Sequence, residues 1–177
     1  MRFHSESKAL QGLARVRNEF AKQIRTRYEH RAQPCASCKT PGACCLDEHF
    51  VNVRITRLEA TAIKRRLAEL PEELQLRVSA RTEEAIERYG LDRQDVYGAK
   101  TYSCPLFEKG IGCLVHDHAK PLPCIAHACY ENKEDLPPDN LLTEREIEVD
   151  RLNESVYPKP TAWLPLPVAI KTHKPER

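Results

Sequence analysis

The chain has 177 residues, of which 41% are hydrophobic and 31% charged, and its formal net charge is +2. A chain of this length buries about 70% of its unfolded surface, so it can form a core of its own. The composition excludes wholesale disorder, and the sequence has no uncharged apolar run of the roughly 18 residues that a membrane span needs. The net charge gives no general sign of polyanion binding, and the unusual feature is the set of eight cysteines.

The first residues indicate the compartment. Residues 1–8 lack the apolar stretch and the small-residue cleavage site of a secretory signal. We therefore expect a cytoplasmic protein, in which thiols stay reduced and clustered cysteines serve as metal ligands or catalytic groups. The alternative is a set of four disulfides, which would require export.

Residues 5–31 are predicted to form one long helix, because apolar side chains recur there every three or four residues. The stripe consists of Leu13, Val16, Phe20, Ile24 and Tyr28. This segment carries seven Lys or Arg against three Asp or Glu. We interpret the excess of positive charge as a solvated helix face, with an acidic or nucleic-acid partner as the alternative.

Two stretches, 34–49 (the first loop) and 101–130 (the second loop), are predicted to be irregular. They contain breakers, show no periodicity and hold all eight cysteines. In the second loop Lys109-Gly110 lies between apolar flanks, which predicts a hairpin turn with Cys104 and Cys113 near its two ends.

A short strand over residues 50–55 and two helices without cysteine are predicted between the loops. Thr56 and Glu59 have the spacing of a capping box, which opens the first of these helices. Pro71 suits the start of the second helix, and Gly90 suits its end.

The last part of the chain is acidic and then rich in proline. Thr143 and Glu146 form a second capping box, which predicts that a short acidic helix starts there. This helix could pack beside the basic first helix or stay exposed. From Tyr157 onward the chain contains five prolines and is predicted to be an extended arm, anchored by Trp163.

The expected fold is therefore mainly α, a small helical domain with two irregular cysteine-rich metal-binding loops and a short strand or hairpin. We divide it into an N-terminal helix (1–33), a cysteine-cluster metal-binding domain (34–130), and an acidic helix with an extended C-terminal arm packed on the same domain (131–177).

The confinement of the cysteines to two loops indicates that the helices hold these loops face to face around metal. The spacing Cys35-x2-Cys38 lets both sulfur atoms reach one ion at about 2.3 Å. The neighbouring side chains of Cys44 and Cys45 diverge, so we expect this pair to serve two metals, or one metal and a structural role. Zinc and an iron–sulfur cluster both fit such ligands. From the residues alone, the core set is Cys35, Cys38, one of Cys44 or Cys45, and one or more of Cys104, Cys113 and Cys124.

Histidines near the cysteines are weaker candidates for metal ligands. These are His49, His116, His118 and His127. A cysteine–histidine nucleophile pair, Cys113 with His116 or Cys124 with His127, is conceivable, because an imidazolium lowers the pKa of a nearby thiol. This reading would leave most of the other cysteines unexplained.

Motifs of nucleotide-binding loops, zinc proteases and serine hydrolases are missing from the sequence. Basic residues are not interleaved with aromatic ones, so nucleic-acid binding is not indicated. We expect no membrane partner, the sequence is compatible with a protein partner, and it does not predict the oligomeric state.

The order of the cysteines follows a recurring pattern. It is carried by Cys35-x2-Cys38…Cys44-Cys45, Cys104-Pro105-Leu106, Gly112-Cys113-x2-His116 and Lys120-Pro121-x2-Cys124. This pattern resembles the YkgJ-type cysteine-cluster family, whose members are described as zinc- or iron-chelating domains. The resemblance implies as metal ligands Cys35, Cys38, Cys44, Cys45, Cys104, Cys113 and Cys124. Cys129 lies outside the common pattern. The larger flagellin lysine methylases have a similar cysteine pattern and are iron–sulfur enzymes, which favours an iron–sulfur cluster over zinc.

Our first functional hypothesis is a metal-binding protein that holds an iron–sulfur cluster or zinc through clustered cysteine thiolates. The alternative is an iron–sulfur enzyme or redox protein that acts in modification or electron transfer. The sequence does not decide whether the protein is an enzyme, and it points to no catalytic residue.

Overall fold

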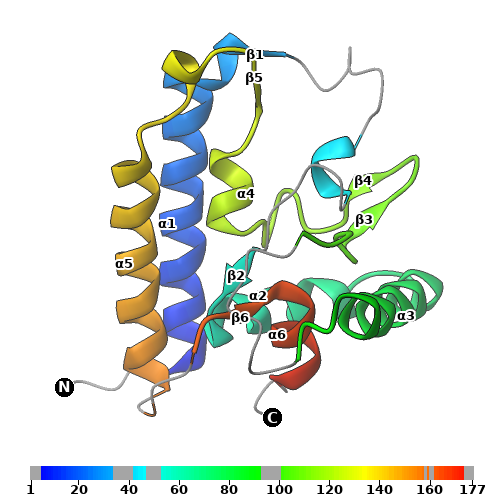
Figure 1. Ribbon diagram of the computed structural model, residues 1–177. Coiled ribbons are helices and arrows are strands. Elements are labelled where there is room, and N and C mark those ends of the chain that lie inside the picture. The colour runs from blue at the N-terminus through cyan, green and yellow to red at the C-terminus, as the bar shows by residue number, and fades with distance from the viewer. Residues whose placement is uncertain are drawn as a thin grey trace. The chain divides into compact units, whose positions relative to one another are not determined.

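The computed structural model describes residues 5–33, 42–46, 53–92, 101–157, 159 and 162–173. These residues are mainly helical, which confirms the predicted fold class (Figure 1). Among them, no helix has both the length and the apolar character that crossing a bilayer demands.

Contacts between residues group the chain into two compact units. Unit 1 comprises Met1–Pro41 and Lys120–Thr161, and unit 2 comprises Gly42–Ala119 and Ala162–Arg177. The boundaries of these units differ from those of the three segments that we expected from the sequence. The division into three segments stays a prediction.

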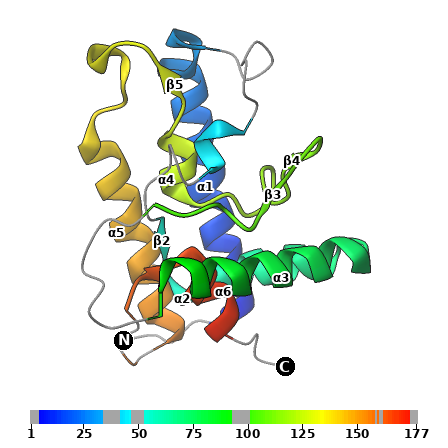
Figure 2. The same ribbon diagram turned by 45° about the vertical axis from the view of Figure 1, so that its right-hand side comes forward.

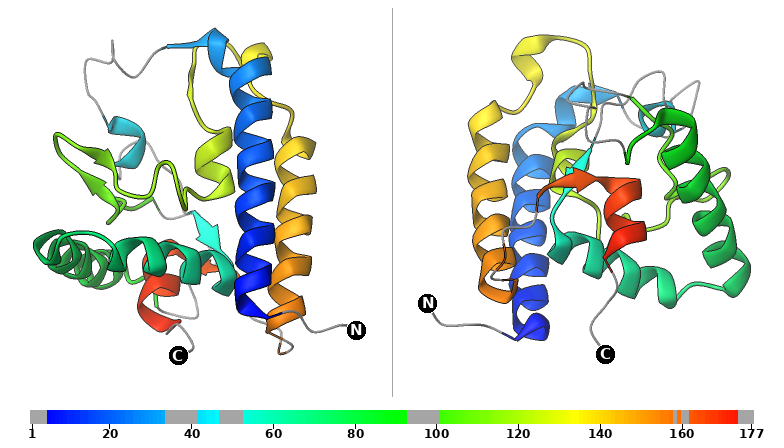
Figure 3. Two further views of the ribbon diagram at one scale, coloured as in Figure 1. Left: turned by 180° about the vertical axis from the view of Figure 1, so that it is seen from behind. Right: turned by 60° about the horizontal axis from the view of Figure 1, so that its bottom comes forward.

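Unit 1 is built on two helices that run side by side, α1 (Glu6–Arg27) and α5 (Asp139–Val156) (Figures 1 and 3). The predicted apolar stripe of α1 is buried at Leu13, Val16, Phe20 and Ile24. A Cβ atom added to Gly12 would lie 3.0 Å from Leu152 of α5, so the small residue lets the two helices approach closely. Of the two possibilities for the acidic helix, the structure therefore shows packing against the basic one.

Short elements complete unit 1. The 3-10 helix η1 (Glu29–Arg31) leads into β1 (Ala32–Gln33), which pairs antiparallel with β5 (Cys129–Tyr130). Helix α4 (Leu122–Ala126) precedes β5, and the 3-10 helix η4 (Lys133–Asp135) follows it. Arg17, a buried residue of α1, donates from Nε to the carbonyl oxygen of Lys120 at 2.8 Å, which ties α1 to the entry of α4.

Unit 2 contains α2 (Arg57–Ala68) and α3 (Glu72–Tyr89), as predicted (Figure 2). The capping box is confirmed, because Thr56 Oγ1 accepts from the Glu59 N–H at 3.2 Å and Glu59 Oε2 accepts from the Thr56 N–H at 2.9 Å. Helix α3 begins after Pro71 and ends at Gly90, whose φ of 58° is left-handed. Only the end of the predicted strand, β2 (Arg54–Ile55), falls within the described residues.

Two sequence predictions about the last part of the chain are wrong. Helix α5 begins at Asp139, after Pro138, and not at Thr143. Inside this helix the Thr143 hydroxyl donates to the Asp139 carbonyl oxygen at 3.2 Å, so it does not cap the helix. A threonine followed three residues later by a glutamate has the same spacing inside a helix as at its start.

The expected extended arm is a strand followed by a helix. Strand β6 (Leu164–Pro165) pairs antiparallel with β2, and α6 (Leu166–Thr172) then packs against α2 and α3 (Figure 3). The buried side chains of Leu166, Ala169 and Ile170 have helical spacing. Pro165 and Pro167 are accommodated because they flank the first helical position, where a backbone N–H has no helical partner.

Candidate functional site

Unit 2 contains four of the predicted metal ligands, from both cysteine loops. Cys44 and Cys45 lie in the 3-10 helix η3 (Ala43–Cys45), Cys113 lies in one strand of a hairpin, and Cys104 precedes that hairpin. The backbone N–H of Cys104 donates to the carbonyl oxygen of Cys45 at 2.8 Å. The described part of the first loop therefore meets the second loop, as the sequence predicts.

A glycine positions the pair Cys44-Cys45. Gly42 has a φ of 85°, in the left-handed region, and its carbonyl oxygen accepts the N–H of Cys45 at 2.8 Å. Its Cα lies against the ring of Phe107, where the Cβ of any other residue would overlap the ring. Glycine is therefore needed at this position for the turn and for the close approach of η3 to the hairpin.

The predicted hairpin is confirmed in the second loop. Strands β3 (Phe107–Glu108) and β4 (Gly112–Cys113) pair antiparallel, with Phe107 opposite Cys113. The turn uses Gly110 and Gly112, with φ of 85° and 100°. Before the hairpin, the buried Tyr102 hydroxyl donates to the Val53 carbonyl oxygen at 2.8 Å. These contacts hold Cys104 and Cys113 on a defined backbone.

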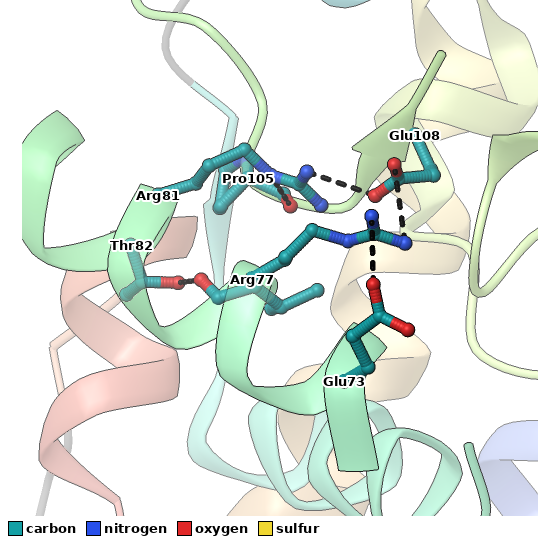
Figure 4. A network of polar contacts seen from close by, with 7 residues as sticks. Glu73, Arg77, Arg81, Thr82, Pro105 and Glu108 are labelled. Atoms are coloured by element: carbon teal, nitrogen blue, oxygen red, sulfur yellow. Dashed lines mark hydrogen bonds and ion pairs between the residues drawn. The ribbon is translucent and has the colours of Figure 1, made fainter. Parts of the chain in front are cut away.

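Two arginines of α3 make polar contacts with the hairpin and with Pro105 before it (Figure 4). Arg81 donates from Nε to the Pro105 carbonyl oxygen at 3.0 Å and from Nη1 to Glu108 Oε2 at 2.9 Å. Arg77 Nη2 lies 3.7 Å from Glu108 Oε1, and Arg77 Nη1 lies 3.4 Å from Glu73 Oε1. The spacing of Glu73, Arg77 and Arg81 on one helix face could have indicated an ion-pair row, but no pattern in the sequence links this row to Glu108.

Some of the groups around the Cys104 sulfur favour its thiolate, and other features of the site favour the neutral thiol. Burial raises the pKa of the Cys104 thiol to about 12, and the nearby Cys113 adds to this rise. The backbone N–H groups of Leu106 and Phe107, which hydrogen-bond the sulfur, and the Arg81 guanidinium lower this pKa. These groups stabilise a thiolate, whereas burial penalises it more strongly, so the neutral thiol is favoured.

The pKa of the Cys45 thiol is affected by the other three cysteines of unit 2. Its hydrogen bond with Cys44 raises the Cys45 pKa far above its ordinary range, and burial raises it further. The charges of Cys104, Cys44 and Cys113 act in the same direction. A bound metal cation near these sulfur atoms would offset the effects that disfavour the Cys45 and Cys104 thiolates.

The other two described cysteines belong to the other unit. Cys124 lies in α4 and Cys129 in β5, and both belong to unit 1. Cys35, Cys38 and the weaker candidate His49 lie outside the described residues. The six cysteines that the structure describes form no disulfide with one another.

The three histidines of the second loop belong to two different units. His116 and His118 follow β4 in unit 2, and the His116 N–H donates to the Cys113 carbonyl oxygen at 3.1 Å. His127 ends α4 in unit 1, where burial and the charge of Lys120 lower its pKa. Within the described ranges, no three side chains of His, Cys, Asp or Glu form a group that could hold a metal ion.

Comparisons of this chain with models of protein families, with curated proteins and with solved structures give no match. The resemblance of its cysteine order to the YkgJ-type family stays a prediction.

Proposed function

We propose that this protein binds a metal centre, an iron–sulfur cluster or zinc, through clustered cysteine thiolates in the reducing environment of the cytoplasm. The observation that carries this proposal is the surroundings of the Cys104 sulfur. Two backbone N–H groups and a guanidinium favour its thiolate, and the neighbouring thiols come from two loops. Half-buried thiols near one another would be stabilised as thiolates by a bound metal cation.

The chemistry of the donors selects the class of metal. Thiolates are soft ligands that prefer zinc or iron–sulfur clusters over magnesium or calcium. Zinc in such sites is tetrahedral and stabilises the fold, and an iron–sulfur cluster uses the same number of thiolates. Cys104 would be one of the residues that hold the metal, and the N–H groups of Leu106 and Phe107 would stabilise the charge of its bound sulfur.

We assign the ligands in two groups. The structure supports Cys44, Cys45, Cys104 and Cys113 by their proximity in unit 2. The resemblance to the YkgJ-type family adds Cys35, Cys38 and Cys124. These residues bind and orient the metal, and we assign no catalytic role to any of them.

The proposal is tested by purifying the protein without oxygen and measuring zinc, iron and acid-labile sulfide, together with the visible spectrum. We expect a stoichiometric metal. A brown colour with broad absorption indicates an iron–sulfur cluster, and a colourless protein with zinc indicates a structural site. A protein that contains neither metal and takes up neither in reconstitution would contradict the proposal.

The metal content of cysteine variants tests which residues are ligands. Cys35→Ser and Cys38→Ser are expected to lower metal content and folding stability together, because metal affinity contributes to the free energy of folding in such sites. Cys129→Ser, outside the common pattern, is expected to lower both by less. Equal loss of metal in all three variants would contradict the division into ligands and non-ligands.

A further inference from the structure

Arg81 is not fully used by the contacts that the structure shows. Its Nε and Nη1 donate to the Pro105 carbonyl oxygen and to Glu108, but its Nη2 is buried and has no hydrogen-bond partner among the described residues. Buried polar groups almost always have a partner, so an orphan N–H group of a charged side chain calls for a specific explanation. Pro105 directly follows Cys104 in the chain, so this guanidinium lies beside the proposed ligand.

The charges around Arg81 leave the guanidinium incompletely neutralised. Arg77 and Arg81 share one carboxylate, Glu108, whose side chain is only 12% exposed. The second carboxylate in the network, Glu73, is 81% exposed and its partner Arg77 is 47% exposed, so solvent screens this pair. Glu108 is therefore the little-exposed carboxylate that the two guanidinium groups share, and the Arg81 charge also acts on the Cys104 sulfur.

The positive charge of Arg81 is opposite in sign to the charge of a metal centre bound by four thiolates. A divalent ion with four thiolates is a dianion, and such an anion in a half-buried site is stabilised by donors and cations around it. Residues that donate to metal-bound sulfur also tune the electronic properties of the centre. Arg81 is the cation of α3 that contacts the segment directly after Cys104.

We propose that Arg81 is a positioning residue of the thiolate centre, holding the Cys104 segment with Nε and Nη1 and donating from Nη2 to the metal-bound sulfur of Cys104. This inference rests on the proposed function and adds to it the residue that balances the charge of the centre. Arg77 is the matched control, because it pairs with the same Glu108 but has no contact with Pro105 among those the structure shows.

The test uses Co²⁺ as the probe, added to the metal-free full chain without oxygen. Thiolate-bound Co²⁺ has sulfur-to-metal charge-transfer bands, and an N–H donor on the sulfur lowers the energy of its lone pair. Loss of the donor in Arg81→Gln is expected to shift the band to longer wavelength and to weaken Co²⁺ binding about 10-fold to 100-fold. Arg77→Gln is expected to leave the band position unchanged.

A second variant separates geometry from charge and covers a failure of Arg81→Gln to fold. Arg81→Lys keeps the charge but lacks the rigid fork of donors, so its band is expected to shift as well, with a smaller loss of affinity. Bands at the wild-type position in the Arg81 variants would overturn the inference, as would an equal shift in Arg77→Gln. If the wild-type protein itself develops no charge-transfer band, the proposed function fails, and this outcome is distinct from the other two.

Discussion

The backbone N–H of Cys104 donates to the carbonyl oxygen of Cys45 at 2.8 Å, which joins the two cysteine loops through their main chains. The positions of these thiols therefore depend on backbone contacts at η3 and at the start of the hairpin. Changes that move either backbone are expected to affect the proposed centre even where they leave every cysteine in place.

Gly42→Ala tests this dependence, with Gly110→Ala as a matched control. Both glycines have a φ of 85°, so each substitution brings the left-handed backbone penalty of about 1–2 kcal/mol. A Cβ at position 42 would also overlap the Phe107 ring, whereas a Cβ at position 110 would have no neighbour within 4 Å in the part of the chain that the structure describes. We expect Gly42→Ala to lower the free energy of unfolding by more than Gly110→Ala and to weaken metal binding.

Urea unfolding and Co²⁺ titration of the two variants measure these effects. Equal losses of stability and affinity in both variants would show that the contact between Gly42 and Phe107 does not position Cys44 and Cys45.

The stability of the metal-free protein is expected to fall as the pH rises above about 9. The Cys104 pKa is raised from 9.0 to about 12, so the folded state binds this proton more tightly than the unfolded state. The stabilisation is complete below the unfolded pKa and is lost as the pH rises through the folded pKa, by at most about 1.4 kcal/mol per pH unit for this thiol. Cys45 shifts in the same direction.

The measurement is the urea midpoint between about pH 8 and about pH 10, with a chelator or with zinc. Zinc is expected to remove the loss, because bound thiolates have already released their protons. Metal-free Cys104→Ser is expected to lose less stability over this range than the metal-free wild type, and equal losses would show that the Cys104 thiol is not responsible.

Substitutions in the two capping-box sequences are expected to change the free energy of unfolding by different amounts. Thr56→Ala removes the acceptor for the Glu59 N–H at the start of α2, and we expect a loss of about 1–2 kcal/mol in the free energy of unfolding. Thr143→Ala changes an exposed residue inside α5, and we expect a change within about 0.5 kcal/mol. A similar loss in both variants, measured by urea unfolding, would contradict the distinction between cap and helix interior.

Features encoded by neighbouring residues were predictable from the sequence. The stripe of α1, the capping box of α2 and the glycine at the end of α3 all act over one or two helical turns. The start of α5 and the helix α6 were not, because a cap motif recurs inside helices and because prolines obscure a short apolar helix. Helix α6 is specified by packing against α2 and α3, which no local pattern records.

Some features of the candidate site were likewise predictable from the sequence, and others were not. The Lys109-Gly110 turn correctly predicted the hairpin, whereas part of the second loop, predicted to be irregular, forms the helix α4. The role of Arg81 and the contact of Gly42 with Phe107 depend on residues that are distant in sequence, so spacing could not reveal them. The division of Cys45 and Cys124 between two units is likewise a property of the packed chain.

The central claim is that cysteine sulfur from both loops binds one metal centre. X-ray absorption at the metal edge of the anaerobically purified protein tests it most directly, because the fine structure counts the neighbours of the metal. We expect a shell of sulfur at about 2.3 Å, diminished or lost in Cys104→Ser. A shell of oxygen and nitrogen alone, or a sulfur shell that is unchanged in Cys104→Ser, would contradict the account.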